Sequence, residues 1–69
     1  MKYRELTRKL EILGCEFRRH GKESHEIWAN RRNGKKASIP NWGAKDLKPG
    51  TVRAILRQLD IDPKDLEKA

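Results

Sequence analysis

The stretch CEFRRHGKESHEIWANRRNGKKASIP, residues 15–40, decides the fold because it contains three short segments with strand character separated by two turns. In residues 15–20 the side chains of Cys15, Phe17 and Arg19 alternate with those of Glu16, Arg18 and His20, which is the two-residue period of a β-strand. Residues 24–30 and 35–40 are typical of a second and a third strand, the last ended by Pro40. Gly21 marks the first turn, and the Asn-Gly pair within 31–34 indicates a hairpin turn. The stretch therefore predicts a meander of three antiparallel strands.

A helix is expected on each side of this meander. Before it, apolar residues recur at the three- and four-residue steps of a helix, namely Tyr3, Leu6, Leu10 and Leu13. Gly14 is expected to end this helix. After it, Pro49 suits the first turn of a helix whose narrow apolar face comprises Val52, Ile55, Leu56 and Leu59. Asp62 and Pro63 start a short terminal helical turn. Two helices on one face of a three-stranded sheet predict an α+β two-layer sandwich, with residues 1–69 as a single domain.

The alternation also predicts which side chains face the core. In the first strand Cys15 is expected in the core with Phe17 and Arg19 on the same side, and His20 on the outer, exposed side. In the second strand Trp28 is expected on the open face of the sheet. The core side of that strand is expected to carry His25, Ile27 and Ala29. His25 would still be accessible if it lies at the mouth of the strand, beyond the cover of the helices, or if a bulge occurs at the Gly21 turn.

The charge favours a polyanionic partner. The 69 residues contain 17 Lys and Arg against 10 Asp and Glu, a formal net charge of +7. Between residues 16 and 36 the cations outnumber the acids, whereas the tail from Asp60 is net acidic. One positive face, as phosphate binding requires, is therefore expected. The alternative is that the basic surface serves only solubility.

Several classes of protein are not expected. Cys15 is the only cysteine, so an intramolecular disulfide is impossible, and with two histidines it forms no zinc site at a familiar spacing. No cofactor is implied. The first ten residues, MKYRELTRKL, offer no apolar stretch for a signal peptide or a membrane span. We expect a soluble, cytoplasmic protein that uses no metal.

Three stretches resemble one protein family. They are the opening helix with its glycine, GKESHEIW at 21–28 and, most specifically, KDLKPGTVRAILRQL at 45–59. In order and spacing they resemble the HicA, or YcfA-like, toxin ribonucleases of bacterial and archaeal toxin–antitoxin pairs. The resemblance implies a fold like the double-stranded RNA-binding domain, endoribonuclease activity toward mRNA, and a HicB-like antitoxin protein that covers the active face.

The resemblance also implies that His25 is the catalytic residue. In the family a histidine at the start of the second strand is catalytic, within a Gly-Ser-His run, but Glu23 stands here where glycine is usual. Many relatives carry a second histidine after the proline, where this chain has Asn41 and Trp42, so His25 is expected to act without a histidine partner. Imidazole suits this chemistry, because its ordinary pKa near 6.5 populates both protonation states and RNA supplies its own 2′-hydroxyl nucleophile. A lone histidine on a strand is otherwise more often structural.

Cations around His25 are expected to hold RNA. Lys22 or Arg18 would stabilise the negative charge that develops on the phosphate, and Ser24 would orient the ring or the phosphate. The N-terminus of the second helix adds a partial positive charge. The expected RNA contacts are Arg18, Arg19, Lys22, Ser24, Lys45, Lys48, Arg53 and Arg57. The alternative for the two helix arginines is ordinary solvated charge.

The sequence leaves two questions open. Trp28 and Trp42 either stack on bases or pack against the protein. The second reading of the whole chain is a non-catalytic RNA-binding module of the same fold, which would have no use for an imidazole at His25.

Overall fold

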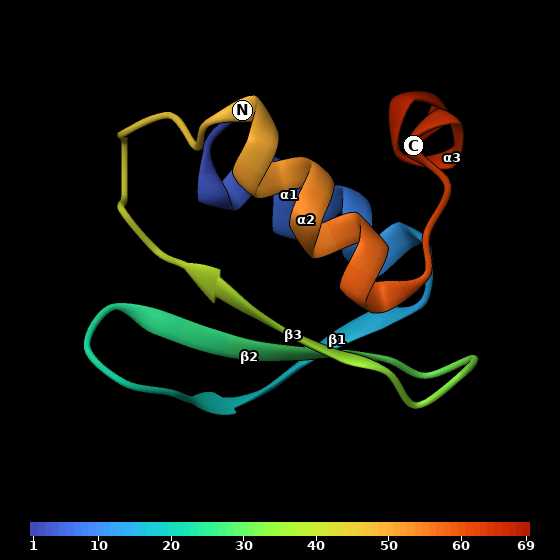
Figure 1. Ribbon diagram of the computed structural model, residues 1–69, viewed down its shortest axis with the longest axis horizontal. Helices are drawn as coiled ribbons and strands as arrows, with labels where there is room; N and C mark the ends of the chain where they lie inside the picture. Colours follow the sequence, from blue (N-terminus) through green and yellow to red (C-terminus); the bar gives the residue numbers. More distant parts are fainter.

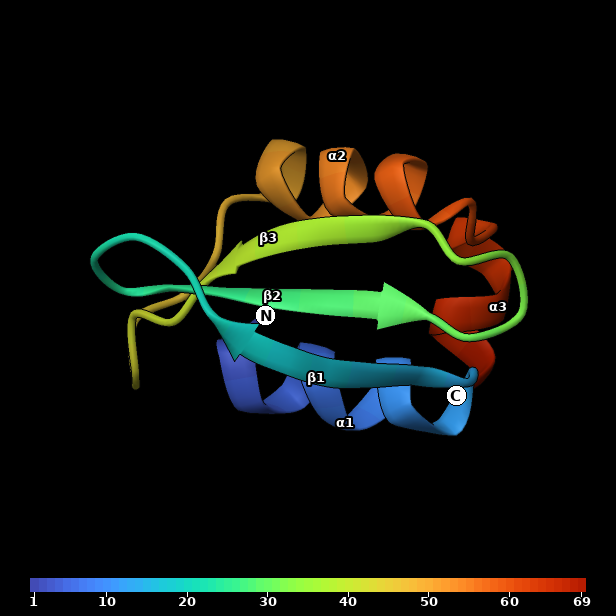
Figure 2. The same ribbon diagram turned by 90° about the horizontal axis from the view of Figure 1, so that it is seen from below.

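The computed structural model describes residues 1–69 and contains the predicted elements in the predicted order (Figure 1). The helices are α1 (Tyr3–Ile12), α2 (Pro49–Leu59) and α3 (Pro63–Lys68), and the strands are β1 (Cys15–His20), β2 (His25–Asn30) and β3 (Lys36–Pro40). The strands form one antiparallel sheet in the order β1-β2-β3. Both long helices cover one face of the sheet, and no helix covers the other, open face (Figures 1 and 2). This is the α+β sandwich expected for a fold like the double-stranded RNA-binding domain.

The helices bury the faces that their periodicity predicts. In α1, Leu6 and Leu10 are fully buried, and Gly14 follows the helix with a φ of +97°, a conformation that glycine adopts without strain. In α2 the buried residues are Ile55, Leu56 and Leu59, with Pro49 at the first turn. The Asp62 side chain caps α3 by accepting a hydrogen bond from the Lys64 N–H at 2.9 Å. The core therefore lies between the helices and one face of the sheet.

The predicted core side of β2 was wrong. Trp28 is only 5% exposed, faces the helices and pairs across the sheet with Ala37, so His25 and Ile27 lie on the open face. Residues 27–29 are all apolar, so alternation alone does not identify the buried side of this strand. The indole buries more apolar area than isoleucine and finds a hydrogen-bond acceptor among the helix residues, which favours the observed side.

A β-bulge changes the sides of the last residues of β1. Phe17 pairs with Trp28 and Arg19 pairs with Ile27, so Arg18 is the extra residue between them. Arg19 therefore lies on the open face, not on the Cys15 side, and His20 lies on the helix side, opposite Glu26. The predicted sides of Arg19 and His20 were wrong for this reason, although His20 is exposed as predicted. Cys15, before the bulge, is buried in the core as predicted.

The loop of residues 41–48 returns the chain from the sheet to the helix layer. Leu47 is buried, and its N–H donates to the Met1 carbonyl at 2.8 Å, while Lys2 and Asp46 form an isolated β-bridge. These contacts fix the start of α2 beside the start of α1. No helix of the chain has the length and apolar character needed to cross a bilayer.

Candidate functional site

His25 lies where a tight turn enters β2. The Gly21 N–H donates to the His25 carbonyl at 2.9 Å, and the His25 N–H donates to the Lys22 carbonyl at 2.9 Å. Between them Glu23 has a φ of +53°, in the left-handed region that favours glycine. The turn thus holds the backbone of His25 at both polar groups and leaves the side chains of Lys22, Glu23 and Ser24 exposed.

The end of β3 closes against the same turn. His25 pairs with Pro40, and the Asn41 N–H donates to the Ser24 carbonyl at 2.8 Å. The Asn41 side-chain oxygen accepts a hydrogen bond from the Gly43 N–H at 3.2 Å, which shapes the start of the following loop. We call this junction, formed by residues 21–25 and 40–41, the His25 corner.

The imidazole of His25 is half-buried and has no hydrogen-bond or ion-pair partner within the protein. Ile27 is the next residue of β2 on the same face, and Arg19 of the neighbouring strand lies opposite Ile27. Lys22 is exposed in the turn. Of the predicted RNA contacts, the structure brings Arg19, Lys22 and Ser24 to the side of the sheet or the turn that carries His25. The Arg19 and Lys22 side chains form no ion pair within the protein.

Arg18 differs from these three residues. Its Nε lies 2.9 Å from Glu16 Oε2, and Arg31 lies at 4.0 Å from the other oxygen of the same carboxylate. Both side chains of the closer pair remain about half exposed, so the contact contributes little to stability. It nevertheless turns the Arg18 guanidinium toward a carboxylate rather than toward the His25 corner.

The remaining predicted contacts belong to the helix layer and the loop before it. Lys45 and Lys48 are exposed in the 41–48 loop, which starts at the His25 corner, and Lys48, its last residue, is the N-cap of α2. Figure 2 shows the start of α2 at the same end of the molecule as the β1–β2 turn. Arg53 instead lines a separate apolar groove of about 280 Å³ between α2 and α3, and Arg57 follows it one turn later. The structure therefore separates Arg53 and Arg57 from the open face.

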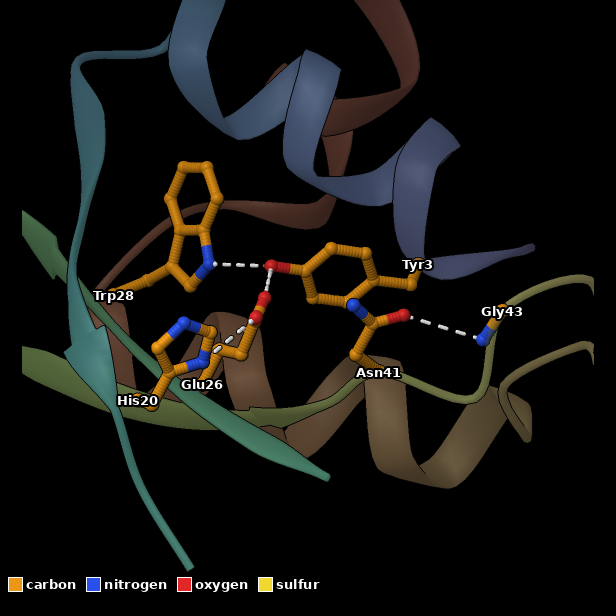
Figure 3. A network of polar contacts seen from close by, with 6 residues as sticks. All are labelled: Tyr3, His20, Glu26, Trp28, Asn41 and Gly43. Carbon is orange, nitrogen blue, oxygen red and sulfur yellow. Dashed lines mark hydrogen bonds and ion pairs between the residues drawn. The ribbon is translucent and has the colours of Figure 1, made fainter. Parts of the chain in front are cut away.

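A second polar cluster, not predicted from the sequence, lies on the helix side of the sheet (Figure 3). The Tyr3 hydroxyl donates to Glu26 Oε2 and accepts a hydrogen bond from Trp28 Nε1 at 3.0 Å. His20 Nδ1 lies 3.3 Å from Glu26 Oε1. Burial, together with the hydrogen bond to Glu26, raises the pKa of Tyr3 to about 12. The Glu26 side chain is only 14% exposed, so these partners satisfy a carboxylate that has little contact with solvent.

The cluster forms one wall of a groove of about 930 Å³ between α1 and the β1 edge of the sheet, which we call the α1–β1 groove. Its lining includes Arg4 and Arg8 from α1, Phe17 from β1, and Asn41 from the His25 corner. The residues come from four separate stretches of sequence. The sequence would have indicated this cluster only if it had shown which face of β2 is buried. The consecutive apolar residues 27–29 prevent that.

No three His, Cys, Asp or Glu side chains of the protein converge in a way that could hold a metal ion. The one thiol, Cys15, is buried, and this burial raises its pKa. It is therefore neither a ligand nor a nucleophile of the His25 corner.

Comparison with known proteins gives a consistent result. Residues 3–61 match the family described as HicA toxin of bacterial toxin–antitoxin. The chain is 39% identical over 61 residues to a probable mRNA interferase HicA of Pseudomonas fluorescens (strain Pf0-1). The aligned region covers 88% of this chain and 97% of the relative. No solved structure matches the chain significantly. The helix–three strands–helix order, the sequence match over most of the chain and the similarity to this relative together place the chain in the HicA toxin family.

Proposed function

We propose that the chain is the ribonuclease toxin of a toxin–antitoxin pair and that it cleaves mRNA with His25 as its catalytic residue. The observation that carries the proposal is the state of the His25 imidazole. It is half-buried, it has no partner within the protein, and it belongs to a corner with an unpaired lysine and a free hydroxyl. An imidazole that no other side chain engages keeps both ring nitrogens available for proton transfer. The similarity to a probable mRNA interferase of Pseudomonas fluorescens supports the same activity.

The chemistry requires one proton carrier and a cationic site for the phosphate. Neutral His25 takes the proton of the 2′-hydroxyl, and the resulting oxygen attacks the adjacent phosphorus. The bond to the 5′-oxygen breaks as that oxygen receives a proton from imidazolium or water, which leaves a 2′,3′-cyclic phosphate and a 5′-hydroxyl. Lys22 and Arg19 stabilise the additional charge of the phosphorane, and Ser24 orients the phosphate. Because the nucleophile belongs to the RNA, the reaction is proposed to need no metal.

A protein partner follows from the same proposal. A HicB-like antitoxin would neutralise the toxin by covering the His25 corner and the cations around it. The open face suits such a partner because no element of this chain packs on it (Figure 2).

Growth and cleavage assays with His25→Ala test the catalytic role. We expect the protein to stop growth when expressed alone, and His25→Ala to restore growth while leaving the circular dichroism spectrum unchanged. Loss of a positioned proton carrier lowers the cleavage rate by about 10²- to 10⁴-fold. Added imidazole should restore part of this activity in His25→Ala but none in Lys22→Ala, which lacks a charge rather than a base. A folded His25→Ala protein that is still toxic and ribonucleolytic would show that the assignment is wrong.

Metal independence has its own measurement. Cleavage should persist in excess EDTA and should leave 5′-hydroxyl ends that a kinase can label directly. Activity that disappears with the chelator and returns with magnesium would contradict the proposal.

One observation favours the second candidate, a non-catalytic RNA-binding module. Glu23 puts a carboxylate into the turn that carries His25, at a position where the family usually has glycine. For such a module His25→Ala would change neither RNA binding nor growth, whereas Lys22→Ala would weaken binding. Lys22→Ala would also flatten the slope of log affinity against log salt by about 0.7 for each lost phosphate contact to a single strand.

A further inference from the structure

We propose that the α1–β1 groove binds one or two unpaired nucleotides of RNA, on the side of the sheet opposite His25. The inference rests on the proposed function and deepens it, because it names single-stranded RNA as the substrate class that reaches the His25 corner. It depends on an exposed aromatic ring, on unpaired cations along the rim, and on the route that connects the groove to that corner.

The aromatic ring is Phe17. It is 44% exposed, although it stands on the side of β1 that faces the helices. Its ring meets those of His20 and Trp28 in edge-to-face contacts, with centroids 5.4 and 6.2 Å apart, so its orientation is restrained. Stacking of a nucleobase on such a ring contributes about 1 to 3 kcal/mol and does not depend on base identity. Only an unpaired base offers its face in this way, because a duplex keeps its bases stacked inside.

The cations are Arg4 and Arg8. They stand four residues apart on α1, so they share one side of the helix, and both line the groove. Both are exposed, and neither forms an ion pair within the protein. The opposite wall carries the little-exposed Glu26 carboxylate, held by Tyr3 as Figure 3 shows. The α1 rim also carries Lys2 and one acid, Glu11, so its net charge is positive. A phosphate is therefore attracted to this rim and repelled from the Glu26 wall, which orients a nucleotide with its phosphate outward and its base toward Phe17.

The groove leads to the His25 corner. Its lining includes Asn41, Gly43 and Ala44, at the start of the loop after β3. The Asn41 backbone N–H is bound to the carbonyl of Ser24, the residue before His25. An RNA strand that leaves the groove past Asn41 thus arrives at the turn that carries His25. It must bend around the end of the sheet to do so, which a flexible single strand permits and a stiff duplex opposes.

Binding measurements with the 69-residue His25→Ala protein, which leaves the RNA uncut, test the proposal. The probes are a labelled single-stranded RNA of about eight nucleotides, an abasic strand of the same length, and a duplex. Phe17→Leu keeps an apolar side chain but removes the ring, and Phe17→Tyr keeps the ring. Ile12→Ala serves as the control, because Ile12 is an exposed apolar residue of α1 that does not line the groove.

We expect Phe17→Leu to weaken binding of the single strand by about 5- to 100-fold, the equivalent of one stacked base. Binding of the abasic strand should not change, and Phe17→Tyr and Ile12→Ala should bind like the parent. Arg4→Ala and Arg8→Ala should weaken both single strands and flatten their salt dependence. Unchanged binding in Phe17→Leu, or an equal loss for the abasic strand or the duplex, would overturn the proposal. Cleavage by the protein with His25 intact is scored separately, so absence of activity would refute the proposed function and leave the groove result standing.

Discussion

Replacement of Glu23 by glycine should stabilise the protein. Glu23 has a φ of +53°, a left-handed conformation that costs a residue with a Cβ atom about 1 to 2 kcal/mol. Glycine avoids this cost but loses more backbone entropy on folding, about 0.4 to 1 kcal/mol. The difference leaves a net gain of roughly 0.5 to 1 kcal/mol in the free energy of unfolding. For a domain of this size that corresponds to a rise of about 3 to 6 °C in Tm.

Thermal unfolding followed by circular dichroism measures this effect, with Glu23→Ala as the matched control. Both changes remove the carboxylate and raise the net charge equally, but alanine keeps the Cβ atom. Glu23→Ala should therefore melt within about 1 °C of the parent, and Glu23→Asn should lie between alanine and glycine because asparagine tolerates this conformation better. Equal Tm values for the glycine and alanine variants would refute the reasoning, since the charge and not the backbone would then govern stability at this turn.

Three further predictions concern the core and the cluster around Tyr3. Because the pKa of Tyr3 is raised to about 12, the folded protein keeps a proton that the unfolded chain releases near pH 10. The free energy of unfolding should therefore fall as pH rises from 10 to 12. Denaturant titrations across this range should show a smaller fall for Tyr3→Phe. Cys15 is 4% exposed and burial raises its pKa, so a thiol reagent at pH 8 should label it only as fast as the protein opens, with immediate labelling in denaturant. Leu10→Ala should lower the free energy of unfolding by about 2 to 5 kcal/mol, measured in urea, because Leu10 is fully buried.

Helix positions could be predicted from the sequence because the helical spacing of apolar residues and the Gly and Pro residues at the helix ends indicate the same boundaries. Leu6 and Leu10 repeat at helical spacing, and Gly14 ends α1 where its left-handed conformation is needed. Pro49 similarly marks the first turn of α2. The three strands and their order were predictable for the same reason, since turn residues separate short segments of strand character. Each of these features depends on residues close together in the chain.

The faces of the strands depend on long-range pairing and could not be predicted in the same way. The side of β2 follows from what Trp28 meets in the fold, namely Tyr3 of α1 and Ala37 of β3, which no local pattern reveals. Likewise, the Glu26 carboxylate reads as a surface charge in the sequence, yet it is mostly buried because Tyr3 and His20 satisfy it. The position of His25 at the start of β2 was foreseen, but its face was not.

The bulge in β1 bears on how many histidines can act on one phosphate. Without the bulge, regular alternation through Arg18 would leave Arg19 on the helix side and put His20 on the open face that also carries His25. The observed register does the reverse: it delivers the guanidinium of Arg19 to the face of His25 and sends His20 to Glu26 on the other side. His20 is therefore engaged with Glu26 on the side of the sheet that His25 does not face, whereas Arg19 shares the face of His25. This register agrees with the mechanism proposed above, which uses one histidine and a cationic partner, and on the helix side His20 contacts the ring of Phe17 beside the α1–β1 groove.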